Sequence, residues 1–377
     1  MESPYVCKLV RLVGILNLYS NPIKRNNMRT LDFTNEPIYV GIDTHKKSWN
    51  VSIMLKEITH KTFTQPPKPD TLSNYLHSNF PGGNYICAYE AGFCGYWIQH
   101  DLEQKGIKCI IVNPADVPTK HKEKDNKTDK VDSRKIARAL RNNELEPIYV
   151  PSRQSLEDRS LSRLRYSIVT DLTRCKNRIK SLLYFYGIDI PEGLDKRSRE
   201  YFNWLESVEL TQATGTSTIK YLLQEYLSLR KIQLDVTRKI RHLSRTDKYT
   251  KHVTLLTSIP GIGITTAMII LTEIDTLSRF NNLDKLCCFI GLVPRVNSSG
   301  EKEIIGDITR RGNMHLKKCL VESSWIAIRK DVALMMNYKD YCKRMEPNKA
   351  IIKITRKLVN RIRFVIKNQK KYQNNKL

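Results

Sequence analysis

Two stretches of this chain repeat apolar residues at alternating spacings of three and four, and this pattern limits the possible folds more than any other feature. They span residues 156–186 and 219–243, with Gln233 at a polar position of the second. Such spacing keeps apolar side chains on one face of a helix, so we expect two long coiled-coil helices. A polar connection separates them, which predicts an antiparallel hairpin that packs within the chain, against a second copy, or both. The repeating residues are Leu161, Leu164, Ile168, Leu172, Cys175, Ile179, Leu182 and Tyr186, then Leu222, Tyr226, Leu229, Val236, Ile240 and Leu243.

Before these helices, strand-like and helix-like segments alternate over residues 38–150. The segment "IYVGIDTHKKSWNVSIML" predicts two strands joined by a tight turn, and "NYICAYEAG" and "IKCIIVNP" predict buried strands. The segments "YWIQHDLEQKG" and "KTDKVDSRKIARALRNNEL" predict helices. This alternation is typical of an α/β layer, and it ends where Pro147 and Pro151 interrupt the pattern.

The remaining parts of the chain follow from these boundaries. Residues 1–37 carry no clear period and form an N-terminal extension. After the coiled-coil helices of 151–250, residues 251–345 predict a compact, mainly helical C-terminal domain. Residues 346–377 predict a basic tail, in which no acidic residue follows Glu346. We expect this tail to be solvated and to contact phosphates.

Charge and cysteine content narrow the class of function. The chain has 64 Lys and Arg against 38 Asp and Glu, a net charge of +26, which favours nucleic acid as a partner. The longest apolar run is too short to span a bilayer, so no membrane partner is expected. The nine cysteines form no CxxC pair, which argues against a disulfide framework or a zinc ribbon and fits a reducing cytoplasm. An apolar fraction of 40% is enough for a core.

Four acidic residues of the α/β layer fall where strands end or a helix begins. Asp43 and Glu90 end predicted strands, and Asp129 and Asp132 share one face at the start of a helix. Taken alone, each has a structural explanation as a turn residue, a surface acid, an N-cap or a partner of the helix dipole. Taken together at one sheet edge, they would repel each other unless cations lay between them. Their oxygen ligands suit Mg²⁺, and two such ions would assist phosphoryl displacement.

The stretch "LLTSIPGIGITTAMIILTEI" predicts a helix–hairpin–helix. In that motif, glycines such as Gly261 and Gly263 let the backbone approach a phosphate, which the amides of the second helix then bind. The structural alternative is an ordinary helical hairpin that needs glycine.

The stretch "GLVPRVNSSGEKEIIGDITRRGN" places a Ser-Ser-Gly turn among cations. Ser299 or Ser298 could act as a nucleophile if a base or a metal activated the hydroxyl. The cations could hold a phosphate. On physical grounds alone, a polar turn with phosphate-binding arginines and no covalent role is slightly favoured over a nucleophilic serine. The cations concerned are Arg295, Lys302, Arg310 and Arg311.

Several of these motifs, in this order, resemble the insertion-sequence-110 family of transposases. The resemblance covers roughly residues 38–335 and is carried by "GIDTHKKSWNVSI", "YEAGFCGYW", "KTDKVDSRKIARAL", "LLTSIPGIGITTAMIILTEI" and "CCFIGLVPRVNSSGEKEIIGDITRRGNMHLKKCLVESSW". It implies a RuvC-like (RNase H-like) nuclease domain that bears an Asp-Glu-Asp-Asp set, followed by a C-terminal transposase domain.

The resemblance also implies roles for residues and partners. By position, Asp43, Glu90, Asp129 and Asp132 would be the metal-binding acids, with Mg²⁺ as cofactor, and Ser299 would be the catalytic serine. It implies DNA recombination for a mobile insertion element through a phosphoserine link, with element ends and a target site as DNA partners. It further implies a structured, element-encoded guide RNA and a homo-oligomer, a dimer or tetramer, in which acids and serine meet from different subunits.

Two alternative functions remain open at this point. A RuvC-like junction nuclease that uses water as nucleophile would need the four acids but not Ser299. A non-enzymatic nucleic-acid-binding protein would need only the helix–hairpin–helix and the basic tail.

Overall fold

The computed structural model describes residues 32–56, 58–119, 128–299, 302–309 and 311–373. The chain divides into two compact units, residues 1–150 and 151–377, and each is described by itself. Most of the predicted N-terminal extension lies outside the described residues.

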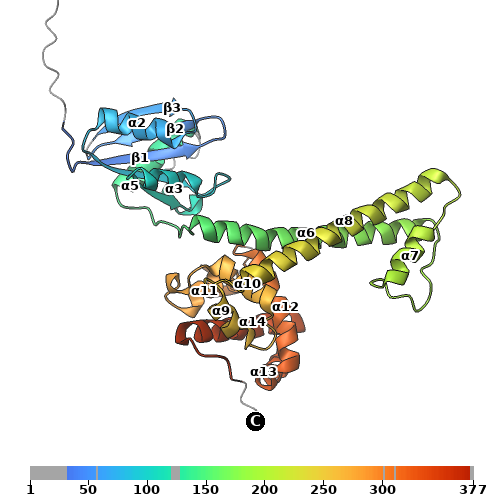
Figure 1. Ribbon diagram of the computed structural model, residues 1–377. Coiled ribbons are helices and arrows are strands. Elements are labelled where there is room, and N and C mark those ends of the chain that lie inside the picture. The colour runs from blue at the N-terminus through green and yellow to red at the C-terminus, as the bar shows by residue number, and fades with distance from the viewer. Residues whose placement is uncertain (1–31, 57, 120–127, 300–301, 310, 374–377) are drawn as a thin grey trace, which may run out of the picture. The chain divides into compact units, whose positions relative to one another are not determined.

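A five-stranded sheet forms the centre of the first unit (Figure 1). Its order is β3-β2-β1-β4-β5, in which β2 is antiparallel to both β1 and β3, and β4 is parallel to β1 and β5. The predicted α/β layer is therefore confirmed, although the sequence analysis did not predict β3. The strands are β1 (Pro37–Thr44), β2 (Trp49–Met54), β3 (Thr59–Gln65), β4 (Asn84–Glu90) and β5 (Lys108–Val112).

Helices cover both faces of this sheet. Helices α2 (Pro69–Asn79) and α3 (Trp97–Gln104) pack on one face through side chains such as Leu76 and Leu102. Helix α5 (Asp129–Arg141) packs on the other face through Ile136 and Leu140. Because successive strand residues point to opposite faces, β4 serves both layers, with Cys87 and Tyr89 on the α2 side and Ala88 on the α5 side.

The backbone of α5 lies unusually close to β1. A Cβ atom on Gly41 would meet the carbonyl oxygen of Ser133 at 2.1 Å and the amide nitrogen of Ala137 at 2.4 Å. Only glycine permits this approach. A buried hydrogen bond of 2.8 Å between the hydroxyls of Ser52 and Ser133 joins α5 to β2 as well. The start of α5 is therefore fixed against the carboxyl end of β1.

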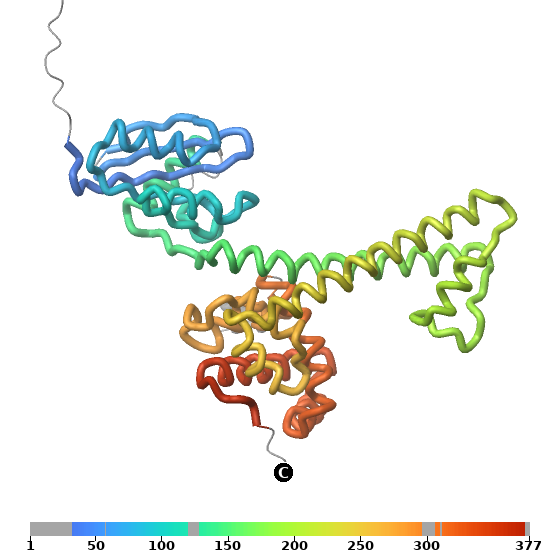
Figure 2. The backbone as a smooth tube through the Cα atoms, in the orientation of Figure 1, coloured from blue at the N-terminus to red at the C-terminus, as the bar shows by residue number. Residues whose placement is uncertain are grey.

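Two long antiparallel helices dominate the second unit (Figures 1 and 2). They are α6 (Arg153–Phe185) and α8 (Ala213–Leu243), and the short helix α7 (Arg199–Ser207) packs on α8. Their shared seam is buried, with Ile168, Leu172, Cys175, Ile179 and Leu183 on α6, and Ile219, Leu223, Tyr226, Val236 and Ile240 on α8.

The predicted seam is wrong at two positions, Leu164 within α6 and Tyr186 just after it. Leu164 is 47% exposed and Tyr186 is 48% exposed. Near Leu164 the helix α10 (Ile264–Ile274) also packs on α6 through small residues such as Ser162, which is buried, so the buried face turns away from Leu164. Tyr186 is the C-cap and lies beyond the last helical turn.

The rest of the second unit is a helical core with one β-hairpin. Helix α14 (Pro347–Asn368) buries the face that carries Ile351, Ile354, Leu358, Ile362 and Val365. The segment predicted as a solvated tail is therefore largely a core helix, because its apolar residues recur every three or four positions and pack on α12 and α13. The elements are α9 (Thr250–Thr257), α10, α11 (Leu283–Ile290), β6 (Pro294–Ser299), β7 (Lys302–Ile308), α12 (Met314–Lys330), α13 (Val332–Cys342) and α14 (Pro347–Asn368).

The eight cysteines among the described residues are all free thiols. Within the same residues, no helix is both long enough and apolar enough to cross a lipid bilayer.

Candidate functional site

The carboxyl ends of two parallel strands bring Asp43 and Glu90 to the same edge of the sheet. Strands β1 and β4 run in register up to the pair Ile42 and Tyr89, and Asp43 and Glu90 are the next residue of each strand. Helix α5 begins at Asp129, and its close packing on Gly41 holds its first turn against the end of β1.

A first group of ligands forms around His45, in the turn after β1. Its Nε2 atom lies 3.2 Å from Oδ2 of Asp43 and 3.4 Å from Oδ2 of Asp129. One ligand atom from each of these three residues lies within 4.8 Å of the others, which is close enough to share a metal ion. His45 was not predicted as a site residue, although its position two residues after Asp43 in a tight turn was a usable signal.

A second group forms around Lys135, in the second turn of α5. Its Nζ atom lies 3.1 Å from Oδ1 of Asp132 and 3.4 Å from Oε1 of Glu90, and the lysine side chain is only 10% exposed. The buried Oε1 atom of Glu90 receives no hydrogen bond from the described residues. The four predicted acids thus lie in two pairs, and each pair shares one cationic or protonatable side chain.

Burial and mutual repulsion make this site favourable for an added cation. Burial raises the pKa of Asp43, and the charges of Asp129 and Asp132 raise it further, while His45 opposes the shift. Burial lowers the pKa of Lys135, but its hydrogen bond to Asp132 and the charge of Glu90 outweigh that effect and raise it. The raised pKa values of Asp43 and Lys135 both indicate that negative charge is concentrated at this half-buried site. Carboxylate oxygens and an imidazole fit a divalent metal ion, which would relieve the same repulsion.

The predicted serines lie at the end of a strand, ahead of the turn itself. In the β6–β7 hairpin, Ser298 pairs with Glu303 and Ser299 pairs with Lys302. Residues 300–301 and Arg310 lie outside the described residues, as do the side chains of 296–305. Arg295 and Arg311 lie exposed at the base of the hairpin.

The base of this hairpin is held by backbone contacts. Gly291, with φ of +85°, and Gly312, with φ of +122°, pack against each other so tightly that a Cβ on Gly312 would meet the Cα of Gly291 at 2.6 Å. The amide of Thr309 donates to the carbonyl of Val293 at 2.9 Å, and the amide of Asn313 donates to that of Phe289 at 2.9 Å. The glycines of the serine-containing stretch therefore fix the ends of the hairpin.

A buried carboxylate, which the sequence analysis missed, supports this base. Glu273 of α10 has no exposed side-chain surface. Arg163 donates to it through two nitrogens, at 2.7 and 2.8 Å, and the side-chain amide of Asn313 donates at 2.6 Å. Burial raises the pKa of Glu273, but the hydrogen bonds from Arg163 and Asn313 outweigh it, so the pKa is lowered overall.

The two predicted phosphate-binding glycines have different surroundings. Gly261 has φ of +90°, and a Cβ there would meet the carbonyl oxygen of Ser323 in α12 at 2.5 Å. Internal packing alone therefore requires glycine at 261. Gly263 precedes α10, and no described atom lies within 4 Å of where its Cβ would be. Of the two, Gly263 has open space for a ligand.

Comparison with known proteins adds evidence of kinship. A family model described as a transposase, of the DEDD type of IS110, matches residues 40–188. A second, described as the transposase IS116/IS110/IS902 family, matches residues 253–340. Together the two models match more than half of the chain, and they occur in the order predicted from the motifs. The chain belongs to the IS110 family of transposases.

Individual members of the IS110 family show a moderate likeness. The protein y4qE of Sinorhizobium fredii is 28% identical over 64% of this chain and 58% of its own length. The transposase for insertion sequence element IS1111A of Coxiella burnetii is 26% identical over 59% of this chain and 60% of its own length. The transposase for insertion sequence element IS1533 of Leptospira borgpetersenii is 22% identical over 76% and 84%, respectively. The chain thus spans less than two thirds of the first two relatives.

The two family matches fall on the two candidate sites of this IS110-family chain. The match over residues 40–188 contains the four acids, His45 and Lys135. The match over residues 253–340 contains the glycines that precede α10, the buried Glu273 and the whole β6–β7 hairpin.

Proposed function

We propose that this IS110-family chain is a DNA transposase that cuts and rejoins DNA strands through a serine–DNA phosphoester. The observation that carries the proposal is the convergence of Asp43 and Asp129 on His45, beside Glu90 and Asp132 on Lys135, within the part of the chain that matches the IS110 transposase model. The strand order of the first unit supports a RuvC-like, RNase H-like fold, in which such a sheet edge carries the acids.

Mg²⁺ is the metal that we propose for this sheet edge. Asp43, Asp129 and His45 would hold one ion, and Glu90 and Asp132 offer carboxylates for a second if Lys135 turns aside. A bound divalent ion would lower the pKa of an attacking hydroxyl and screen the charge of the scissile phosphate. In the structure, the side chains of His45 and Lys135 lie between these carboxylates.

Ser299 is the nucleophile that we propose, with Ser298 as the alternative. The Ser299 oxygen would form a bond to the scissile phosphorus while the bond from phosphorus to the leaving deoxyribose oxygen breaks. The serine proton passes to a base, and the leaving oxygen takes up a proton. Rejoining reverses these steps, so strand exchange needs no external energy source. Arg295, Lys302, Arg310 and Arg311 are proposed to hold the phosphate and stabilise its developing charge.

Domain roles and nucleic-acid contacts complete the proposal. Residues 38–150 are the nuclease domain, 151–250 the coiled-coil helices and 251–345 the transposase domain. The net charge of +26 supports phosphate-dominated binding of element ends and target DNA. Gly263, and Gly261 if its packing allows, are proposed as backbone contacts of a helix–hairpin–helix. A structured, element-encoded RNA is proposed as the guide that selects these sites.

We also propose that the chain works as a dimer or tetramer. Several apolar residues of the α6–α8 hairpin stay exposed beside the buried seam, namely Leu164, Val169, Leu227, Ile232 and Leu234. A second copy packed along the hairpin would cover part of this exposed apolar surface. Sedimentation of the protein with nucleic acid should then show a dimer or a larger oligomer. A strict monomer under active conditions would exclude a site that combines the acids of one subunit with Ser299 of another.

The deciding experiment is detection of a covalent adduct. The full-length protein is incubated with its element's end DNA, the element's RNA and Mg²⁺, and DNA whose gel migration is restored by protease is measured. Ser299→Ala should lose the adduct and keep DNA binding, whereas Ser298→Ala should keep both. If Ser299→Ala still cleaves DNA and Asp43→Ala does not, the nucleophile is water and the junction nuclease is correct. If neither variant nor wild type cleaves, the chain only binds nucleic acid.

A further inference from the structure

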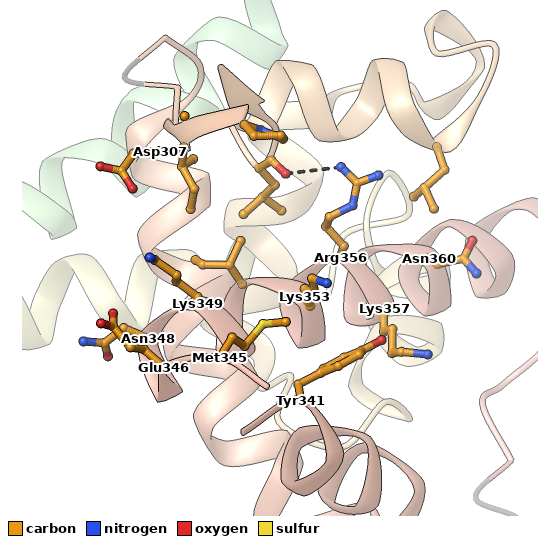
Figure 3. Close-up of a pocket in the computed structure, with 16 residues that line it drawn as sticks. Asp307, Tyr341, Met345, Glu346, Asn348, Lys349, Lys353, Arg356, Lys357 and Asn360 are labelled. Atoms are coloured by element: carbon orange, nitrogen blue, oxygen red, sulfur yellow. Dashed lines mark hydrogen bonds between the residues drawn. The ribbon is translucent and has the colours of Figure 1, made fainter. Parts of the chain in front are cut away.

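A large cleft opens at the base of the β6–β7 hairpin, between the hairpin and helices α13 and α14 (Figure 3). Its volume is about 1030 Å³, at the upper end of the ~300–1,000 Å³ of small-molecule sites. Much of its wall is apolar and comes from both sides: Leu292, Pro294 and Ile308 belong to the hairpin region, and Met345 and Ile352 lie on the helical side.

Cations from one face of α14 line the same cleft. Lys349, Lys353, Arg356 and Lys357 follow the spacing that places residues on one side of a helix. Arg356 is engaged within the fold, since it donates to Oδ1 of Asp284 at 2.8 Å. The lysines extend from α14 beside the cleft, as Figure 3 shows.

An aromatic ring and two acids complete the lining. Tyr341 contributes its ring, and Nζ of Lys353 lies 5.3 Å from the ring centre. Asp307 lies on the hairpin side and Glu346 at the start of α14. Cations outnumber these acids, so the lining is positive overall while its walls are apolar and aromatic.

We propose that this cleft binds an unpaired nucleotide of a single strand. The base lies against Met345 and Ile352, and the flanking phosphates contact Lys349 and Lys357. A nucleotide combines a flat apolar ring with an anion, which is the combination that the cleft offers. An apolar protein segment in this place would bury the lysine ammonium groups without partners, which costs free energy. An acidic peptide would leave the apolar wall unfilled.

The position of the cleft connects it with Ser299. Pro294 lines the cleft and begins β6, and Ser299 ends the same strand. Five residues of extended chain span ~17 Å, about the length of five stacked nucleotides in one strand. A strand whose phosphate reaches Ser299 can thus place an unpaired base in the cleft. This placement rests on the proposed function, whereas the binding of a single strand does not.

Binding of short oligonucleotides to the full-length protein tests the proposal. The probes are labelled dT12, its abasic counterpart, U12 and a 12-base-pair duplex, each titrated over a range of salt concentrations. Met345→Trp fills the cleft without removing a core side chain, and should weaken the better-bound of dT12 and U12 at least about fivefold. It should leave binding of the abasic strand and the salt slope unchanged. Tighter binding of dT12 assigns the cleft to DNA, and tighter binding of U12 assigns it to RNA.

Two double variants that remove lysine charges test the role of the lysines in the cleft. Lys349→Gln combined with Lys357→Gln should reduce the slope of log affinity against log salt by about 1.4. Lys330→Gln combined with Lys339→Gln removes two exposed lysines outside the cleft and should leave that slope unchanged. The proposal is overturned if folded Met345→Trp, judged by its Tm, binds every strand like wild type, or if the two double variants behave alike. Ser299→Ala should keep single-strand binding, so loss of its adduct tests the nucleophile and not the cleft.

Discussion

Asn313 donates a hydrogen bond of 2.6 Å to Oε2 of Glu273, a carboxylate with no exposed side-chain surface. The oxygen of the same Asn313 side chain accepts from the amide of Leu316 at 3.0 Å and so caps α12. Asn313 thus connects the turn that follows β7 to α10. The two hydrogen bonds from Arg163 to Glu273 extend this connection to α6. The base of the hairpin that carries Ser299 is thus linked to the helical core through the buried carboxylate of Glu273.

Glu273→Gln should therefore destabilise the second unit strongly. The substitution keeps the shape of the side chain but removes a buried negative charge that pairs with Arg163, which is 55% exposed, and with Arg159, which is 11% exposed. Removing the partner of hydrogen-bonded groups at a buried position costs about 1–3 kcal/mol. Urea unfolding at pH 7 measures the loss.

The control for Glu273→Gln is Glu225→Gln. Glu225 also pairs with an arginine, Arg178, but its side chain is 41% exposed. Exposed pairs contribute about 0–1 kcal/mol, so the control should change stability little. Equal losses in the two variants would contradict a special role for the buried pair.

The stabilisation by Glu273 should also depend on pH. Its pKa in the folded chain is lowered, so its contribution is complete above the unfolded pKa of about 4.3. The contribution is lost as the pH falls through the folded value. The difference in unfolding free energy between wild type and Glu273→Gln should thus shrink below about pH 4. A constant difference between pH 7 and pH 3 would show that folding does not lower the pKa of Glu273.

Asp43→Asn should have opposite effects with and without a divalent metal. The pKa of Asp43 is raised, so its charged form costs stability, and that cost grows as the pH rises from the unfolded pKa, about 3.9, through the folded value. At pH 7 without metal, Asp43→Asn should therefore raise the Tm. Adding Mg²⁺ at 100 times its Kd should stabilise wild type by about 2.7 kcal/mol and the variant much less.

Asp70→Asn is the control for the metal response, because Asp70 is an exposed acid of the same unit that pairs with Lys105. It should keep the full shift in Tm on addition of Mg²⁺. The metal site would be excluded if Mg²⁺ stabilised Asp43→Asn as much as wild type.

Gly41→Ala tests the close contact that positions the acids. The added methyl group would lie 2.1 Å from a backbone oxygen of α5, and backbone can relieve such a clash only by moving the helix. We expect a loss of about 3 kcal/mol, at the upper end for overpacking, together with a weaker Mg²⁺ response. Gly92→Ala is the control, since its Cβ would meet nothing closer than 3.9 Å. A similar Tm for the two variants would contradict this account.

The sequence predicted elements with strong periodicity and missed those without it. β1, β2, β4 and β5 carry runs of apolar residues, and α6 and α8 carry sustained seams, so all were predictable. β3 is an edge strand whose sequence, "THKTFTQ", is mostly polar and exposed, and therefore has no core-facing alternation. The many Lys and Arg residues of α14 indicated a solvated tail, although the helix also carries an apolar face that is buried in the structure.

The candidate site was predictable only where topology determines position. Parallel strands end at one edge, which brings Asp43 and Glu90 together, and a helix start brings Asp129 and Asp132. The roles of His45, Lys135 and Glu273 depend on side-chain contacts between distant parts of the chain. For example, Arg163 and Glu273 are far apart in sequence and meet only because α10 packs on α6. No short sequence pattern predicts a contact between residues so far apart in the chain.

Substitutions at the two glycines before α10 should have different effects. Gly263→Ala should leave the Tm unchanged, because the added methyl group has open space and the backbone is already in the extended region. If the amides there contact a phosphate, the methyl group should hinder its approach, weaken duplex DNA binding and reduce the salt slope by about 0.9. Gly261→Ala should instead lower the Tm, because of its positive φ and its contact with α12. Filter-binding or anisotropy titrations over a range of salt concentrations measure the first effect, and thermal unfolding measures the second. Unchanged DNA affinity in Gly263→Ala would mean that this turn is a helical hairpin that serves only packing, and that the phosphate contacts lie elsewhere on the basic surface.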